Sequence, residues 1–112
     1  MSEKKSQKKL IWLSYDLGID GDYENLYYWL DRLEAKECGD NIAAFYYSVK
    51  ADAANEISES LKETINIRSK DRIYIVYKNN DGKYKGKFLY GRRKTAPWEG
   101  YARGVEDQDS EL

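Results

Sequence analysis

Two groups of residues could support chemistry in this chain, and the first is a pair of carboxylates. Asp16 ends an apolar run and precedes a glycine-containing loop that also carries Asp20. Hard cations such as Mg²⁺ and Mn²⁺ prefer oxygen ligands, so this pair is a candidate metal site. An aspartate in this position also commonly accepts hydrogen bonds from backbone N–H groups. The sequence leaves both interpretations open.

The second group is a basic stretch from Lys78 to Lys94, which holds seven basic residues and a single acid, Asp81. Cations contact phosphates and aromatic rings stack on bases, so a mixture of lysines and tyrosines suits nucleic-acid binding. An exposed lysine row on an edge strand also blocks aggregation between sheets. The candidate nucleic-acid contacts are Lys83, Lys85, Lys87, Arg92 and Arg93.

The composition excludes several kinds of active site. Histidine is absent, which removes Ser–His and Cys–His nucleophile pairs and histidine metal ligands. Cys38 is the one cysteine, so it can form no internal disulfide and has no resolving partner. The net charge of -1 argues against a general affinity for nucleic acid or anionic membrane, although a local basic face is compatible with it.

Apolar periodicity predicts the elements that position these groups. Asp22 and Asp52 are expected to cap the two helices, and Asn79 to Gly82 is expected to form a hairpin turn. The predicted elements, in chain order, are a strand at 10–17, a helix at 23–37, a central strand at 41–49, a helix at 53–65, and strands at 71–78 and 83–90.

This order predicts an α+β fold, a ferredoxin-like two-layer sandwich. Each helix connects two strands, and right-handed crossovers place both helices on one face of a mainly antiparallel sheet. A doubly wound Rossmann-like sheet is the alternative, but no G-x-G-x-x-G follows the first strand. We expect one domain at 9–101, between a disordered basic N-terminus at 1–8 and an acidic tail at 102–112.

Partners and location are also expectations at this point. No stretch approaches the ~20 apolar residues that span a bilayer, and no signal peptide is recognised, so a cytoplasmic protein without membrane contact is expected. Tyrosine-rich strands and the aromatic pair Trp98 and Tyr101, which could form a short edge segment, predict a symmetric homodimer.

Residues 13–17 (Leu-Ser-Tyr-Asp-Leu) and 21–23 (Gly-Asp-Tyr) resemble the opening of small bacterial SinR-like proteins. Residues 71–76 and 96–101 are similar to a later strand and an aromatic tail of that family. More distantly, the layout resembles the small CRISPR-associated metal-dependent nuclease, the dimeric ferredoxin-like subunit of the spacer-integration complex. That resemblance implies a metal ligand at Asp16, whereas Asp20, Asp22 and Glu24 stand where that family has basic residues.

Two functional classes follow from these observations. One is a non-enzymatic dimeric scaffold or interaction module that pairs with a protein or nucleic-acid partner. The alternative is a metal-dependent endonuclease of toxin or CRISPR-associated type, with Mg²⁺ or Mn²⁺ at Asp16 and phosphates along 78–94.

Overall fold

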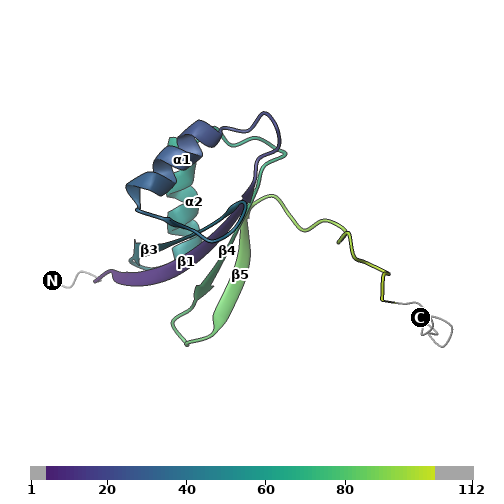
Figure 1. Cartoon of the computed structure of the whole chain (residues 1–112). Coiled ribbons are helices and arrows are strands. Elements are labelled where there is room, and N and C mark those ends of the chain that lie inside the picture. Colours follow the sequence, from purple (N-terminus) through teal and green to yellow (C-terminus); the bar gives the residue numbers. More distant parts are fainter. Residues whose placement is uncertain (1–4, 103–112) are drawn as a thin grey trace.

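The computed structural model describes residues 5–102, which build one antiparallel sheet of five strands with two helices packed against it (Figure 1). The strands lie side by side in the order β2-β3-β1-β4-β5. The α+β architecture is therefore confirmed. The elements in chain order are β1 (Gln7–Asp16), α1 (Tyr23–Arg32), β2 (Lys36–Glu37), β3 (Ile42–Val49), α2 (Ala53–Thr64), β4 (Arg72–Lys78) and β5 (Tyr84–Tyr90).

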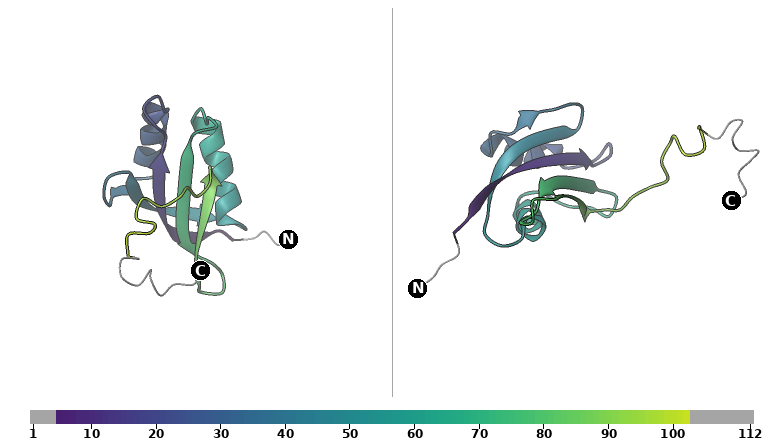
Figure 2. Two further views of the ribbon diagram at one scale, coloured as in Figure 1. Left: turned by 90° about the vertical axis from the view of Figure 1, so that its right-hand side faces the viewer. Right: turned by 90° about the horizontal axis from the view of Figure 1, so that it is seen from below.

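Both helices lie on the same face of the sheet, and within residues 5–102 no helix or strand covers the other face (Figures 1 and 2). Side chains alternate between these faces along β1. Ile11 and Leu13 are fully buried against the helices, whereas Trp12 is half-buried and Ser14 exposed on the opposite side. The apolar run at 10–17 predicts a buried strand, but only one face of β1 is buried. We call the two sides the covered face and the open face.

The core fills the space between the covered face and the helices. Trp29 of α1 packs edge-on against Phe45 of β3, with ring centroids 5.4 Å apart. Its indole Nε1 donates a hydrogen bond of 2.9 Å to Ser60 Oγ, which links α1 to α2. Burial of these apolar side chains is the main stabilising contribution. The fully buried aliphatic residues are Ile11, Leu13, Leu17, Leu26, Ile57, Leu61, Ile73 and Ile75.

Helix α1 begins where the sequence predicts but ends five residues early. Asp22 caps it by accepting a hydrogen bond from Asn25 N. The helix ends at Arg32, because Glu34 adopts a left-handed conformation with φ 57° and Ala35 N donates back to Leu30 O. The prediction of a helix to residue 37 is therefore wrong. Residues 36 and 37 instead form β2, an edge strand that the sequence did not indicate.

Helix α2 confirms its predicted span except for residue 65, which follows the last helical residue and is itself buried. Its cap differs from the prediction, because the side chain of Asp52 makes no capping hydrogen bond. The carboxylate of Glu56 accepts instead from the backbone N–H groups of Lys50, Ala51 and Asp52, at 2.9, 2.6 and 2.9 Å. These bonds lower the pKa of Glu56, with the Lys50 N–H contributing most.

The β4–β5 hairpin confirms the turn predicted at 79–82. Asn79 Oδ1 accepts from Asp81 N and Lys83 N, and Gly82 takes a left-handed φ of 81°. Strict alternation along the strand predicted at 83–90 would place Tyr84, Gly86, Phe88 and Tyr90 on one face, and this is wrong for Tyr90. A β-bulge shifts the register, so Tyr90 lies opposite Ile73 on the covered face and donates to Ser58 O at 2.8 Å.

The ends of the described chain also correct two expectations. Strand β1 begins at Gln7, so residues 7 and 8 pair with β3 although a disordered segment was predicted there. Residues 97–101 form turns, not an edge strand, and Trp98 and Tyr101 are exposed. The acidic tail predicted at 102–112 lies outside the described residues, except for its first residue. None of the helices in the described part is long and apolar enough to cross a membrane.

Candidate functional site

The open face carries an aromatic pair where β4 meets β5. Tyr74 and Phe88 lie opposite each other in the strand register, with ring centroids 4.7 Å apart and planes inclined by 64°. The tyrosine ring extends across β5 because residue 86 is glycine. A Cβ at Gly86 would collide with the Tyr74 hydroxyl group. The small residue thus makes room for an aromatic surface on a strand that is otherwise rich in lysine.

Two arginines lie over this pair of rings. The Arg93 guanidinium carbon is 5.9 Å from the Tyr74 ring centroid and 5.6 Å from that of Phe88. The Arg72 guanidinium carbon is 5.8 Å from Phe88, within the range of cation–π attraction. Arg72 Nη1 also donates to Arg92 O at 3.1 Å, which holds the segment after β5 close to the sheet.

Gly91 allows the chain to pass this closely over β4. Its φ is 82°, a left-handed value that favours glycine. A Cβ at this position would lie 2.8 Å from Arg72 Cγ and 2.7 Å from the carbonyl oxygen of Asp71. The glycine therefore positions Arg93 over the open face.

A larger hollow lies between the first half of β1 and the hairpin. Strand β1 pairs with β4 only from Trp12 onward, so its first residues diverge from the hairpin. This hairpin hollow has a volume of about 570 Å³. The rings of Trp12 and Tyr84 lie 6.4 Å apart on its wall, and Lys78 Nζ is 5.4 Å from the Tyr84 centroid. Lys8, Lys9, Asn79 and Asn80 line it as well.

A smaller hollow lies at the other end of the open face, beside the end of β1. It has a volume of about 230 Å³. We call it the strand-end hollow. Asp16 is directly opposite Arg72 in the β1–β4 register, and the two share this hollow with the aromatic pair. The lining residues are Ser14, Asp16, Arg72, Tyr74, Phe88 and Arg93.

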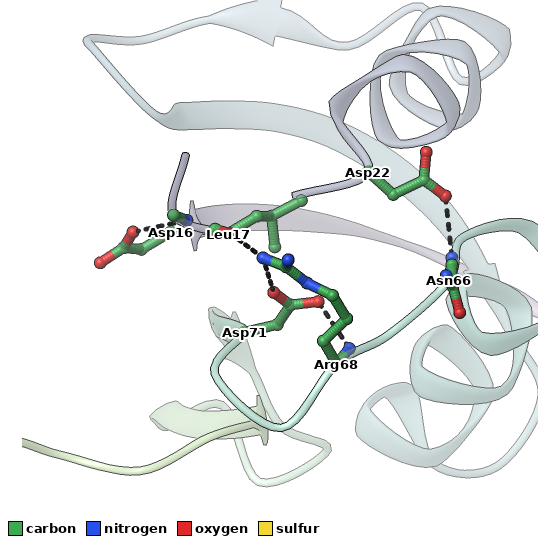
Figure 3. Close-up of polar contacts among 7 residues, drawn as sticks. Asp16, Leu17, Asp22, Asn66, Arg68 and Asp71 are labelled. Carbon is green, nitrogen blue, oxygen red and sulfur yellow. Dashed lines mark hydrogen bonds and ion pairs between the residues drawn. The ribbon is translucent and has the colours of Figure 1, made fainter. Parts of the chain in front are cut away.

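The structure does not gather the predicted metal ligands into a cation site. Asp16 Oδ1 accepts a hydrogen bond from Gly18 N at 3.3 Å, which fits the loop-acceptor interpretation (Figure 3). Asp20 is exposed in the following loop. Within residues 5–102, no three or more Asp, Glu or Cys side chains form a group that could hold a metal ion. The charged residue opposite Asp16 is an arginine, not another acid.

A separate polar network fixes the loop after β1. Arg68 lies between this loop and Asp71, donating to Leu17 O at 2.7 Å (Figure 3). Asp71 is buried, accepts from Arg68 N at 2.8 Å and forms an ion pair of 3.5 Å with the guanidinium group. Asp22 adds a second connection, because its carboxylate accepts from Asn66 N at 2.9 Å. These contacts hold the end of β1, and so Asp16, in place.

Asp22 therefore serves the fold, as the helix cap that the sequence predicts and as an acceptor for Asn66 N. Its bonds to the Asn25 side chain and to Asn66 N lower its pKa. On the covered face, Tyr15 packs against Tyr23 and Tyr27. Burial, together with a hydrogen bond to Tyr27, raises the pKa of Tyr15 to about 12. This phenol stays neutral at physiological pH and acts in packing.

Of the five predicted nucleic-acid contacts, Arg93 alone joins the aromatic surface of the open face. Lys85 and Lys87 lie opposite Tyr77 and Ile75 in the register, so they project on the side of the covered face. Lys83 donates its backbone N–H within the hairpin turn, and Arg92 contributes its carbonyl group to Arg72.

The site residues that the sequence did not indicate lie on β1 and β4. Trp12 lies in the strand predicted at 10–17, and Arg72 and Tyr74 lie in the strand predicted at 71–78. Neither prediction says which face of the sheet these side chains occupy. Along β4, Arg72, Tyr74, Val76 and Lys78 alternate with Ile73, Ile75 and Tyr77. This period-two pattern was the available signal for a polar, aromatic face opposite the core.

No protein-family model, curated protein or solved structure matches this chain.

Proposed function

We propose that this protein is a non-enzymatic binding module whose open face holds single-stranded nucleic acid. The observation that carries the proposal is the set of solvent-facing rings with cations above or beside them. Aromatic side chains on an open sheet stack bases, and lysines and arginines contact the backbone phosphates. The residues concerned are Trp12, Tyr74, Tyr84 and Phe88, with Lys8, Arg72, Lys78 and Arg93.

The dimensions of the face favour a single strand. Tyr84 and Phe88 are four residues apart on β5, a separation of about 14 Å at ~3.4 Å per residue. This length is comparable with sheet platforms that stack two or three bases. Stacking requires the flat side of each base to be free, which a duplex does not offer. The charge of the open face also fits. Among the side chains that line the two hollows, Asp16 is the one acidic residue, and the lysines and arginines outnumber it.

We also propose that the two-layer α+β sandwich is of the ferredoxin-like type. The order β2-β3-β1-β4, with both helices on one face, supports a ferredoxin-like arrangement. Strand β5 extends the sheet beyond β4, so the full order is not the simple four-stranded one. In this interpretation the extra strand widens the open face and supplies Tyr84 and Phe88 to it. The resemblance to SinR-like proteins and to CRISPR-associated integration subunits, and a cytoplasmic location, remain proposals as well.

The geometry supports binding better than the nuclease alternative. Asp16 is the residue on which metal-dependent cleavage would depend, and it lies opposite Arg72 and lines a hollow with Arg93. Two guanidinium groups near one carboxylate disfavour a divalent cation by charge repulsion. They favour an anionic or hydrogen-bonding ligand instead.

A homodimer is proposed as well. Tyr46 is 60% exposed on the same side of the sheet as Trp12, so a second copy could pack there. Tyr46 lies on β3, on the other side of β1 from the rings of β4 and β5. Light scattering on the sample used for binding should give about twice the chain mass of 13.1 kDa. A monomeric mass at tens of micromolar protein would contradict the dimer.

The test of the proposed function is fluorescence anisotropy with labelled eight-nucleotide single strands and the matching duplex. We expect the single strands to bind more tightly than the duplex, with an affinity that falls as salt rises. The Tyr84→Ala variant should weaken single-strand binding about tenfold, since stacking on one ring contributes roughly 1–3 kcal/mol. Tyr84 is 63% exposed, so its removal should leave the unfolding curve unchanged.

Tyr28→Ala provides a matched control. Tyr28 is 57% exposed on α1, and the Arg32 guanidinium carbon lies 5.7 Å from its ring. It is thus an exposed tyrosine beside a cation, as Tyr84 is, but on the helical side of the molecule. We expect this variant to bind as the wild type does. If wild-type protein binds no single strand at low salt, or if the two variants behave alike, the proposal is wrong.

A further inference from the structure

The strand-end hollow contains a pattern of acceptors and donors that suits one particular base. At about 230 Å³ it is smaller than the pockets that enclose drug-sized ligands, so a single nucleobase fits its scale better. Its walls combine the Tyr74 and Phe88 rings with the Asp16 carboxylate and two arginines. Rings and guanidinium planes supply stacking surfaces, and the carboxylate supplies a directional acceptor.

The Asp16 carboxylate has acceptor capacity to spare. Its one hydrogen bond in the described chain is to Gly18 N, at 3.3 Å and through Oδ1. Within residues 5–102 it forms no ion pair of 4.0 Å or less with Arg72 or Arg93, although all three line the same hollow. An ionised carboxylate offers about four lone-pair sites. Most of them therefore remain for a ligand that presents two neighbouring donors.

Among the four bases, guanine alone presents such a pair of donors on its Watson–Crick edge. Its N1–H and its N2 amino group lie side by side and match the two oxygens of a carboxylate. Adenine has an acceptor at N1, cytosine has an acceptor at N3, and uracil has a single N–H between two carbonyl groups. Each of these places a lone pair against the carboxylate and is disfavoured by repulsion.

Arg93 completes the pattern on the adjacent edge of the same base. A guanidinium fork donates two hydrogen bonds to guanine O6 and N7, the commonest specific contact of arginine with a base. Arg93 is exposed over the aromatic pair, and its position depends on the hydrogen bond from Arg72 to Arg92 O and on the left-handed Gly91. Arg72 is in this respect a positioning residue, and Arg93 is the one that contacts the base.

We infer that the strand-end hollow selects a guanine from the bound single strand, with Asp16 accepting from N1–H and N2–H and Arg93 donating to O6 and N7. This inference rests on the proposed single-strand binding. It assigns to Asp16 a role in base recognition, where the sequence had suggested a metal ligand.

The experiment compares eight-nucleotide uridine strands that carry one guanosine, inosine or adenosine at the same central position. Affinities are measured by anisotropy at one fixed salt concentration. We expect guanosine to bind about tenfold or more tighter than adenosine, the size of discrimination given by a good bidentate contact. Inosine lacks the N2 amino group but keeps N1–H and O6, so it should fall between the two.

Two variants assign the preference to its residue. Asp16→Asn keeps the shape and an acceptor for Gly18 N, but it replaces one carboxylate oxygen with an amide donor. It should remove the advantage of guanosine over inosine and lower the guanosine preference to what Arg93 gives through O6 and N7. The adenosine strand should bind as tightly as before or slightly more tightly. Asp20→Asn makes the same change at an exposed carboxylate of the following loop, which does not line the hollow, and should keep the full preference. Unfolding curves of both variants should overlay that of the wild type.

The outcomes separate the inference from the proposed function. If the wild type binds all three strands equally well, guanine selection is overturned and single-strand binding stands. If the full guanosine preference, including that over inosine, persists in Asp16→Asn, the assignment to Asp16 is wrong. If no strand binds at all, the proposed function fails, and guanine selection fails with it.

Discussion

Two aspartates in this molecule lie close to arginines, with opposite results. Asp71 is 1% exposed, accepts from the backbone of Arg68 and forms an ion pair with its side chain. Asp16 is exposed, and within the described residues its carboxylate accepts from Gly18 N alone, although Arg72 is its direct neighbour across the strands. The first carboxylate is occupied within the fold, and the second keeps its capacity for a ligand.

The difference teaches how to separate structural from functional charge in a small domain. A buried carboxylate must be hydrogen-bonded or paired, so it predicts little about function. The Arg68–Asp71 pair connects the loop after β1 to the segment before β4, which fixes the end of β1. Asp16 lies on that fixed end but contributes little to it. A carboxylate held rigidly without being used by the fold is a better candidate for recognition.

Replacing each aspartate by asparagine should give the largest contrast, in stability. Asp71→Asn removes the charge of a buried pair and should lower the free energy of unfolding by about 2–3 kcal/mol. This loss is at or below the usual range for breaking a buried ion pair, because Arg68 is partly exposed. Asp16→Asn should change it by less than about 0.5 kcal/mol, as for ordinary surface substitutions. Urea unfolding at pH 7 measures both.

Equal losses in the two variants would remove the distinction between the carboxylates. Asp16 would then belong to the structural network, and its assignment to base recognition would lose its basis. A control at Asp81, exposed in the hairpin turn, should behave as Asp16 does when replaced by asparagine.

Much of the fold could be predicted because it depends on local periodicity and capping. The two helices, the four longer strands and the hairpin at Asn79 each leave a pattern within a few neighbouring residues. Strand β2 does not, because its two residues become a strand only through pairing with β3. The early end of α1 depends on a left-handed Glu34, a conformation that glutamate does not signal in sequence.

The site was less predictable because it depends on register. Asp16 could be placed at the end of a strand, but its neighbour Arg72 follows from β1–β4 pairing between segments far apart in the chain. The lysines of β5 were correctly seen as a row. Their side of the sheet depends on how β5 pairs with β4, where Lys87 lies opposite the buried Ile75. The bulge that moves Tyr90 to the covered face likewise appears only in the pairing.

The comparison between the faces extends to their lysines and gives a prediction of intermediate size. The double variant Lys8→Gln with Lys78→Gln removes two cations beside the hairpin hollow, whereas Lys85→Gln with Lys87→Gln removes two from the other side. Each phosphate contact with a single strand contributes about 0.7 to the slope of log K against log salt. We expect the first pair to reduce the slope by about 1.4.

The second pair carries the same charge change and should leave the slope nearly unaltered. Anisotropy titrations between 50 and 200 mM salt, a range in which such contacts lose affinity measurably, compare the two. A larger reduction of the slope by the β5 variant would show that the nucleic-acid strand follows the lysine row, as the sequence alone suggests, and not the open face.

The smallest expected effect concerns Glu56, a carboxylate between the two extremes, since it is half-buried and accepts three backbone hydrogen bonds. Three backbone N–H groups donate to it and lower its pKa below the ordinary 4.5. A lowered pKa in the folded state means that the stabilisation is complete above about 4.5 and is lost as the pH falls through the folded value. Glu56→Gln should therefore cost on the order of 1 kcal/mol at pH 7, a typical capping contribution, and progressively less below pH 4.5.

Glu59→Gln, an exposed change on the same helix, should cost nothing at either pH. Urea midpoints measured from pH 7 to pH 3 give the difference between variant and wild type at each pH, which cancels the parallel contribution of Asp22. A difference that stays constant across this range would mean that Glu56 stabilises α2 by packing alone, and engagement by the backbone would no longer distinguish it from Asp16.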